Sequence, residues 1–265
     1  MPLRSIEGLS IMALTIFHQD PRRVVRAERG KKSAFGHLFG GAADYSGLVA
    51  NKRQPAVHLL FRLNTDDPLV GVDLGAVRWL PLLCAIRYGA CGLGYRVTSD
   101  DEVEILHQKE TKAWDDFPYD GYPQKLPARA LAMKEEPYNP RRTTDALVYA
   151  GIFGYDHLNP SQFSKLARFI EKRGFWDPND SDYESAERYL REGNPWPFVQ
   201  GPPECACPEP RCPNHGRPSS LRTFAIFEEE EQHVRKLWGP DCGSLQIIYQ
   251  VCPECSAIVT CNQCT

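Results

Sequence analysis

The chain has 265 residues, of which 42% are hydrophobic and 25% are charged, and its formal net charge is only −3. This near-neutral balance argues against a protein that works mainly on nucleic acid, which would carry a basic excess. No run approaches the ~20 apolar residues of a membrane helix, and LSIMALTIF at 9–17 lacks the flanks of a signal peptide. We therefore predict a cytoplasmic protein with reduced thiols, built as one large domain or two small ones.

The first half of the chain carries strand patterns. Residues 13–17 (ALTIF) predict a first strand or helix, behind an extension at 1–11 that we interpret as dispensable. Runs of branched and aromatic residues, bounded by Gly, Asp and Pro, then predict further strands. These runs are 56–65, 79–88, 93–99 and 102–106, and the stretch 79–106 is typical of an antiparallel meander.

The middle of the chain is predicted to be helical. Residues 145–154 could form a strand or a helix, because so short an apolar run has no decisive period. Asn159 as N-cap, Pro160 in the first turn and Gly174 as a left-handed stop predict a helix between them. A second helix is predicted at about 182–192.

The last third returns to strand patterns. The acidic run that opens 228–238, with basic residues toward its end, is typical of a solvated helix. Proline-rich segments at 115–142 and 195–218 predict long ordered loops. The predicted strands of this part are 221–227, 245–251 and 257–260.

An internal similarity links the two halves. Tyr88 and Cys91 end one apolar run as YGAC, and Tyr249 and Cys252 end another as YQVC, each followed by a turn and a further strand. The matching order favours two related β units. We predict an α+β fold that is antiparallel and β-rich, with a few packed helices and a zinc-knuckle segment in one globule. Its parts are a β-rich unit at 12–142, a helical segment at 143–200 and a zinc-binding β unit at 201–265.

Eight of the ten cysteines fall between residues 205 and 264. Two thiols separated by two residues, with Pro or Gly nearby, form a metal knuckle. A redox pair would instead open a helix after a strand, whereas CPEC lies between two predicted strands. The sequence therefore predicts zinc, with these candidate ligands: Cys205, Cys207, Cys212, His215, Cys252, Cys255, Cys261 and Cys264.

These ligands could hold one or two zinc ions. Two sites could follow the sequence order, the first four ligands in one and the last four in the other, as the close spacing favours. They could also interleave, with Cys205 and Cys207 joining Cys252 and Cys255, which would tie the C-terminal segment to its neighbours. His215 lies in NHG, which is also an ordinary turn. Either arrangement closes the tetrahedron with protein ligands, so the predicted zinc is structural.

No catalytic set is recognisable in the sequence. Cys84 and Cys91 lie in or beside apolar runs with no histidine at a suggestive spacing, so we interpret them as buried structural thiols. The aromatic and acidic residues around 115–142 are candidate contacts for another protein. They could equally pin the loop to the core. The candidates are Trp114, Asp115, Asp116 and Tyr119, whose acidic members would suit a basic partner.

Three stretches carry a family resemblance: HLFGGAADY at 37–45, GNPWPFVQGPPE at 193–204 and GSLQIIYQVCPECSAIVTCNQC at 243–264. Together they resemble the bacterial YwqG-like family of unknown function, although this chain has GGAA where a proline is expected. The resemblance implies a duplicated β architecture. It also implies a binding role, because members are similar to proteins proposed as antidotes of bacterial toxins. It implies no functional residues.

The leading hypothesis is a non-enzymatic, zinc-stabilised protein that binds another protein, with immunity to a toxin as its sharpest form. A zinc-dependent hydrolase is the first alternative and would keep one coordination position open. A zinc-ribbon protein that binds nucleic acid is the second. Neither a membrane nor a soluble cofactor other than zinc is predicted as a partner.

Overall fold

A computed structural model describes residues 14–264 with internal gaps. The gaps are 18–22, 30, 49–56, 89–91, 110–111, 115–118, 138, 140–141, 154, 156–157, 175, 180–181, 193–197, 199, 201–202 and 229–244. The predicted extension at 1–11, nearly all of the acidic run at 228–238, and Cys91, Asp115 and Asp116 therefore lie outside the described residues.

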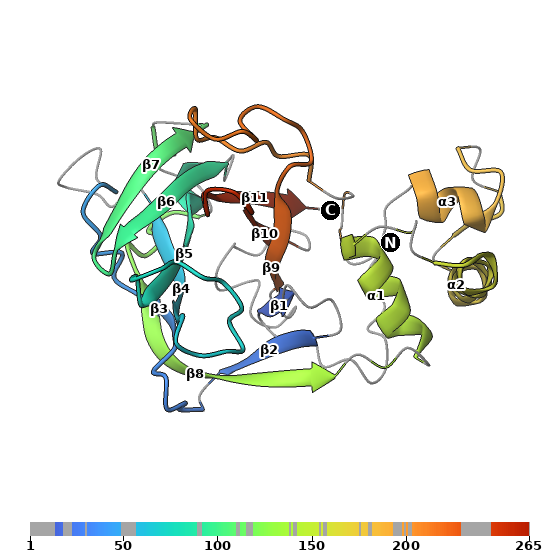
Figure 1. Ribbon diagram of the computed structural model, residues 1–265, viewed down its shortest axis with the longest axis horizontal. Helices are drawn as coiled ribbons and strands as arrows, with labels where there is room; N and C mark the ends of the chain where they lie inside the picture. Colours follow the sequence, from blue (N-terminus) through green and yellow to red (C-terminus); the bar gives the residue numbers. More distant parts are fainter. Residues whose placement is uncertain are drawn as a thin grey trace.

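The described strands form one sheet of eleven, in the order β5-β4-β3-β8-β2-β1-β9-β10-β11-β6-β7, and paired strands run antiparallel. Figure 1 shows how strongly this sheet curls. The strands are β1 (Thr15–Phe17), β2 (Arg23–Arg29), β3 (Leu38–Gly41), β4 (His58–Asn64), β5 (Trp79–Cys84), β6 (Leu93–Ser99), β7 (Glu102–Gln108), β8 (Leu126–Pro137), β9 (Arg222–Glu228), β10 (Leu245–Val251) and β11 (Ile258–Cys264).

The curl brings the β5 end of the sheet back toward β6 and β11. The Tyr95 hydroxyl on β6 donates to the Pro81 carbonyl on β5 at 2.7 Å, and the Thr260 hydroxyl on β11 donates to the Leu83 carbonyl at 2.9 Å. Both side chains are buried. Their hydroxyl bonds join β5 to β6 and β11, where the strands do not pair by backbone hydrogen bonds, and so close the concave side of the sheet. The result is a half-barrel with an enclosed core.

The core takes consecutive buried residues from several strands, because both faces of β4, β5 and β9 are covered. The ring of Phe61 on β4 packs edge-on against Phe39 and Phe227, with centroids 5.4 and 5.2 Å apart. Leu60, Phe61 and Tyr95 are completely buried. Because β9 and β4 share this core, the two halves of the chain depend on each other.

The N-terminal and C-terminal strands interleave within the sheet. β1 pairs with β9, and β6 pairs with β11, so the predicted units at 12–142 and 201–265 contribute to the same sheet. β10 and β11 are neighbours, whereas β5 lies at one end of the sheet and β6 lies near the other. The two stretches that looked like repeats therefore pair their strands differently, and the fold is mostly β.

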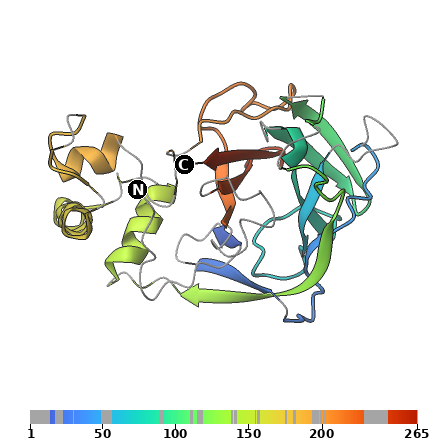
Figure 2. The same ribbon diagram turned by 180° about the vertical axis from the view of Figure 1, so that it is seen from behind.

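Within the described residues, three helices follow β8: α1 (Thr143–Phe153), α2 (Pro160–Arg173) and α3 (Ala186–Glu192). Leu147 and Ala150 of α1 belong to the apolar cluster of α2 and α3, whereas Val148 and Ile152 pack on the outer face of the sheet. Figures 1 and 2 show α1 between the sheet and the other two helices. In the part of the chain that is described, no helix combines the length and the apolarity needed to span a membrane.

The element predictions are confirmed at several places. The strand at 93–99 and the helix from Pro160 to Gly174 match, including a capping box between Asn159 and Gln162. The ambiguous run at 145–154 belongs to helix α1. The loop predicted at 115–142 is wrong over 126–137, which forms β8, and the meander at 79–106 reduces to the β6–β7 hairpin.

Candidate metal centre

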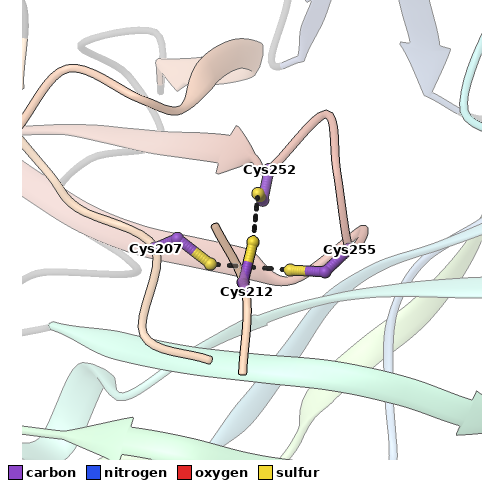
Figure 3. A group of neighbouring side chains, drawn as sticks. All are labelled: Cys207, Cys212, Cys252 and Cys255. Carbon is purple, nitrogen blue, oxygen red and sulfur yellow. Dashed lines mark hydrogen bonds between the residues drawn. The ribbon is translucent and has the colours of Figure 1, made fainter. Parts of the chain in front are cut away.

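Four cysteine sulfurs converge from two segments that lie far apart in the sequence. Cys207 and Cys212 come from the loop before β9, and Cys252 and Cys255 come from the turn between β10 and β11 (Figure 3). The Sγ atoms of Cys207 and Cys255 are 3.5 Å apart, those of Cys212 and Cys252 are 3.6 Å apart, and all four lie within 4.8 Å of one another. Tetrahedral zinc with bonds of about 2.3 Å places its sulfurs about 3.8 Å apart, so the four thiols fit this metal.

The β10–β11 turn holds its two thiols by its own backbone. The N–H of Cys252 donates to the Ala257 carbonyl at 2.8 Å, and the N–H of Ser256 donates to the Cys252 carbonyl at 3.0 Å. Ser256 has a positive φ of 57°, which reverses the chain after Cys255. The turn forms a knuckle as the CPEC motif predicts, because Cys252 and Cys255 point to the same side (Figure 3).

The loop that supplies Cys207 and Cys212 folds back on itself. The N–H of Cys212 donates to the Glu209 carbonyl at 3.0 Å, and the N–H of Gly216 donates to the Cys207 carbonyl at 3.2 Å. The His215 ring lies 3.1 Å from the same Cys207 carbonyl through Nδ1. These bonds fold the loop back around its thiols.

The loop rests on the outer face of β6. A Cβ atom on Gly94 would lie 2.8 Å from Cγ of Pro208, so only glycine leaves room for the loop to lie this close. Beside it, Nη1 of Arg96 on β6 lies 2.9 Å from the buried carboxylate of Glu209. Glu209 also accepts from the side chain and the N–H of Arg211, and these bonds lower its pKa. An ion pair therefore joins the ligand loop to the sheet.

N–H groups are directed at the sulfurs. The N–H of Asn214 donates to Sγ of Cys212 at 3.4 Å, and its amide nitrogen donates to Sγ of Cys252 at 3.7 Å. Burial raises the pKa of Cys252, but N–H donors, among them those of Glu254 and Cys255, outweigh it and leave this pKa at about 7. Cys252 therefore ionises more readily than an ordinary cysteine, as a metal ligand must.

Two other thiols of the cluster hold their protons more firmly. Burial raises the pKa of Cys207 to about 11, and burial together with its thiol neighbours raises the pKa of Cys255 above its ordinary value. A metal that binds here must displace these protons, so its affinity falls as the pH falls.

The remaining ligand candidates lie elsewhere. His215 is exposed and its ring caps the loop backbone, as the alternative of an ordinary turn predicted. Cys261 lies inside β11 opposite Ile248, three residue pairs from the turn, and neither Cys261 nor Cys205 belongs to the group of four sulfurs. β11 extends to Cys264, whose side chain is outside the described part. Since β11 is extended, CNQC does not fold as a knuckle that turns back to CPEC.

The observed grouping differs from both arrangements drawn from the sequence. Ligands come in pairs from two distant segments, as the interleaved arrangement predicted, but the loop contributes Cys207 and Cys212 instead of Cys205 and Cys207. The sequence analysis also missed Asn214 and Glu209. The signal for the Cys207–Cys212 pair was its spacing of four residues within CPEPRC, where two prolines favour a tight loop.

The predicted partner contacts separate into two groups. Tyr122 is buried and its ring packs edge-on against His58 and Tyr119, so these two tyrosines pin their loop to the core. Trp114 is 51% exposed, and within the described residues it is the large hydrophobic side chain that stands out in this way. Its N–H donates to the Arg87 carbonyl at 2.8 Å, which fixes the backbone beneath it.

Comparisons with protein-family models, curated proteins and solved structures find no match to this chain. The resemblance to the YwqG-like family therefore stays a prediction. What is available for a functional argument is the site itself: a closed group of four thiols, with N–H donors around it, on the outside of a curled antiparallel sheet.

Proposed function

We propose that this is a zinc protein whose metal is structural, and that it acts by binding another protein. The observation that carries the proposal is the set of four sulfurs from Cys207, Cys212, Cys252 and Cys255 within 4.8 Å. Four thiolates complete the tetrahedron of a structural zinc and leave no position for a reactive water. This favours a structural site over the hydrolase alternative, which needs an open position.

The geometry supports a joining role for the metal. The ligand loop contacts the sheet through Gly94 with Pro208 and Arg96 with Glu209. A zinc ion would bind this loop directly to the β10–β11 turn. Metal binding contributes on the order of 10 kcal/mol to the order of small zinc modules, which is enough to hold such a loop.

The binding role rests on Trp114. A large aromatic side chain that is half exposed on an anchored backbone is typical of a hot spot at a protein interface. An immunity protein that occludes a bacterial toxin would be one instance of this role, and the nucleic-acid alternative has no comparable feature in its support.

The zinc site is tested by elemental analysis of protein purified without added metal. We expect one equivalent of zinc per chain in the wild type and in His215→Ala, and its loss in Cys252→Ser. His215→Ala is the matched control, because it removes a predicted ligand that the cluster does not contain. Less than half an equivalent in the wild type, or zinc loss in His215→Ala, would contradict the proposed site.

The binding role is tested by affinity measurements against a captured partner, or against a toxin encoded beside the gene. Trp114→Ala should raise the Kd by about tenfold or more, since a hot-spot aromatic contributes about 2 kcal/mol or more. Lys112→Ala is the control, because Lys112 is an exposed neighbour on the same loop. Equal affinity of Trp114→Ala and the wild type would remove Trp114 from the interface.

A further inference from the structure

The ligand loop lies across the β6–β7 hairpin as well as beside the β10–β11 turn. Pro208 of the loop sits directly over Gly94, and the carboxylate of Glu209 lies 2.9 Å from Nη1 of Arg96. Gly94 and Arg96 are alternate residues of β6, so both present the same face of the strand to the loop. A loop that is fixed by the metal is therefore also fixed against β6.

The second strand of the hairpin, β7, depends on this cover. It is the last of the described strands in the sheet and takes its ladder bonds from β6, while Ser46 bonds to its outer edge near its start. Toward its other end, Leu106 packs against the apolar cluster that contains Cys207 of the ligand loop. Just beyond β7, the N–H of Lys109 donates to the Gly92 carbonyl at 3.1 Å. This end of the hairpin is thus held by β6 on one edge and by the ligand loop on one face.

The same end of the hairpin leads to Trp114. Trp114 follows Lys109 by five residues, and its N–H donates to the carbonyl of Arg87, in a 3-10 turn at Ile86–Tyr88 that precedes β6. Two backbone bonds, from Lys109 to Gly92 and from Trp114 to Arg87, therefore fasten the start and the end of the segment 109–114 to the chain before β6. A change at the end of the hairpin has only a few residues to cross before it reaches Trp114.

We propose that the metal centre regulates the binding surface at Trp114: with the metal bound, the ligand loop clamps the β6–β7 hairpin and so orders the segment 109–114. This inference rests on the proposed function, both for the zinc site and for the role of Trp114. When the metal leaves, the loop lifts from β6 and Leu106, the strands stay paired, and the end of the hairpin opens more often.

The opening matters for binding because of its cost in entropy. An aromatic side chain that is already fixed in its binding position loses less conformational freedom when a partner binds. The metal-bound protein is therefore the form with the higher affinity at Trp114, and loss of the metal weakens binding without removing any residue from the surface.

The test is hydrogen exchange of the full-length protein, measured as purified, after zinc is removed with EDTA and after zinc is added back. Fragmentation of the peptides locates the deuterium at the N–H groups of Lys109 and Trp114. We expect both to exchange about tenfold faster without zinc, within the usual range of coupling between two sites, and to recover with zinc. The Asn64 N–H on β4, which donates to the buried His37 ring at 3.0 Å, is the reference and should not change.

Glu209→Gln separates the clamp from the metal, because it weakens the ion pair with Arg96 and leaves every sulfur in place. With zinc measured on the same samples, we expect faster exchange at Lys109 and Trp114 in this variant. Ser220→Ala, which removes a hydrogen bond inside the loop, should match the wild type. If zinc removal speeds exchange in the ligand loop but leaves Lys109 and Trp114 unchanged, the proposal is wrong and the zinc site stands. Protein that is purified without zinc would reject the metal site on which the proposal rests.

Discussion

Asn214 shows how a single residue can connect both segments of the four-cysteine cluster. Its N–H reaches the sulfur of Cys212 in its own loop, and its side-chain amide reaches the sulfur of Cys252 in the β10–β11 turn. Donors of this kind stabilise thiolate charge and orient the lone pairs that a metal uses. The sequence alone gave no reason to choose Asn214, because only the fold brings residue 214 to residue 252.

We expect Asn214→Ala to weaken zinc binding by about tenfold or more, since neighbours that orient metal ligands typically contribute 10- to 100-fold in affinity. Competition with a chromophoric chelator measures the effect. Ser220→Ala is the control: it removes a hydrogen bond to the Asn214 carbonyl but none to sulfur. Unchanged zinc affinity in Asn214→Ala would mean that the amide does not support the ligand.

At the scale of elements, the contact between β6 and the ligand loop depends on the absence of a side chain. We expect Gly94→Ala to lower the free energy of unfolding by about 1–3 kcal/mol, because its Cβ would press on Pro208, and to speed zinc release. Denaturant unfolding and chelator-driven release measure the two effects. Gly92→Ala is the matched control, since its Cβ would meet Lys109 at an acceptable 3.4 Å. Equal behaviour of the two variants would show that the loop can move away at no cost.

The elements that were predictable are those that local signals determine. Helix α2 has a cap, a first-turn proline, an apolar stripe and a glycine stop, and each of these acts within a few residues. β8 has no such local signal, since its ARALAMKEE core favours a helix. It becomes a strand because β2 and β3 pair with its two edges. The CPEC knuckle was predictable because its signal also lies within a few residues. Cys207 and Cys212 meet CPEC only through contacts between distant segments, so the sequence analysis grouped them with other ligands.

At the scale of the whole molecule, the four-cysteine cluster lies on the outside of a sheet whose β9, β10 and β11 are interior strands. Removal of zinc should therefore release the ligand loop without unfolding the strands on either side. Trypsin should then cut the chelated protein after Arg211, which is exposed in this loop, while β9 to β11 stay protected. Zinc added back before digestion serves as the control. Cleavage throughout 222–264 would show that the metal stabilises the strands as well as the loop. If the loop stays uncut, the metal stabilises neither the loop nor the strands.

The interleaving of the strands has a consequence for the order in which the protein can form during synthesis. β1 needs β9 as its partner, β6 needs β11, and the two segments of the metal centre are separated by the whole of β9 and β10. Contacts of such long sequence separation form slowly, since a large loop must close before any of them stabilises the chain. A nascent chain that has made its first eight strands therefore waits with open sheet edges. The CPEC turn follows β10 in the chain, so it emerges after the ten strands β1 to β10. A metal held by all four thiols would therefore bind only after β1 to β10 have emerged.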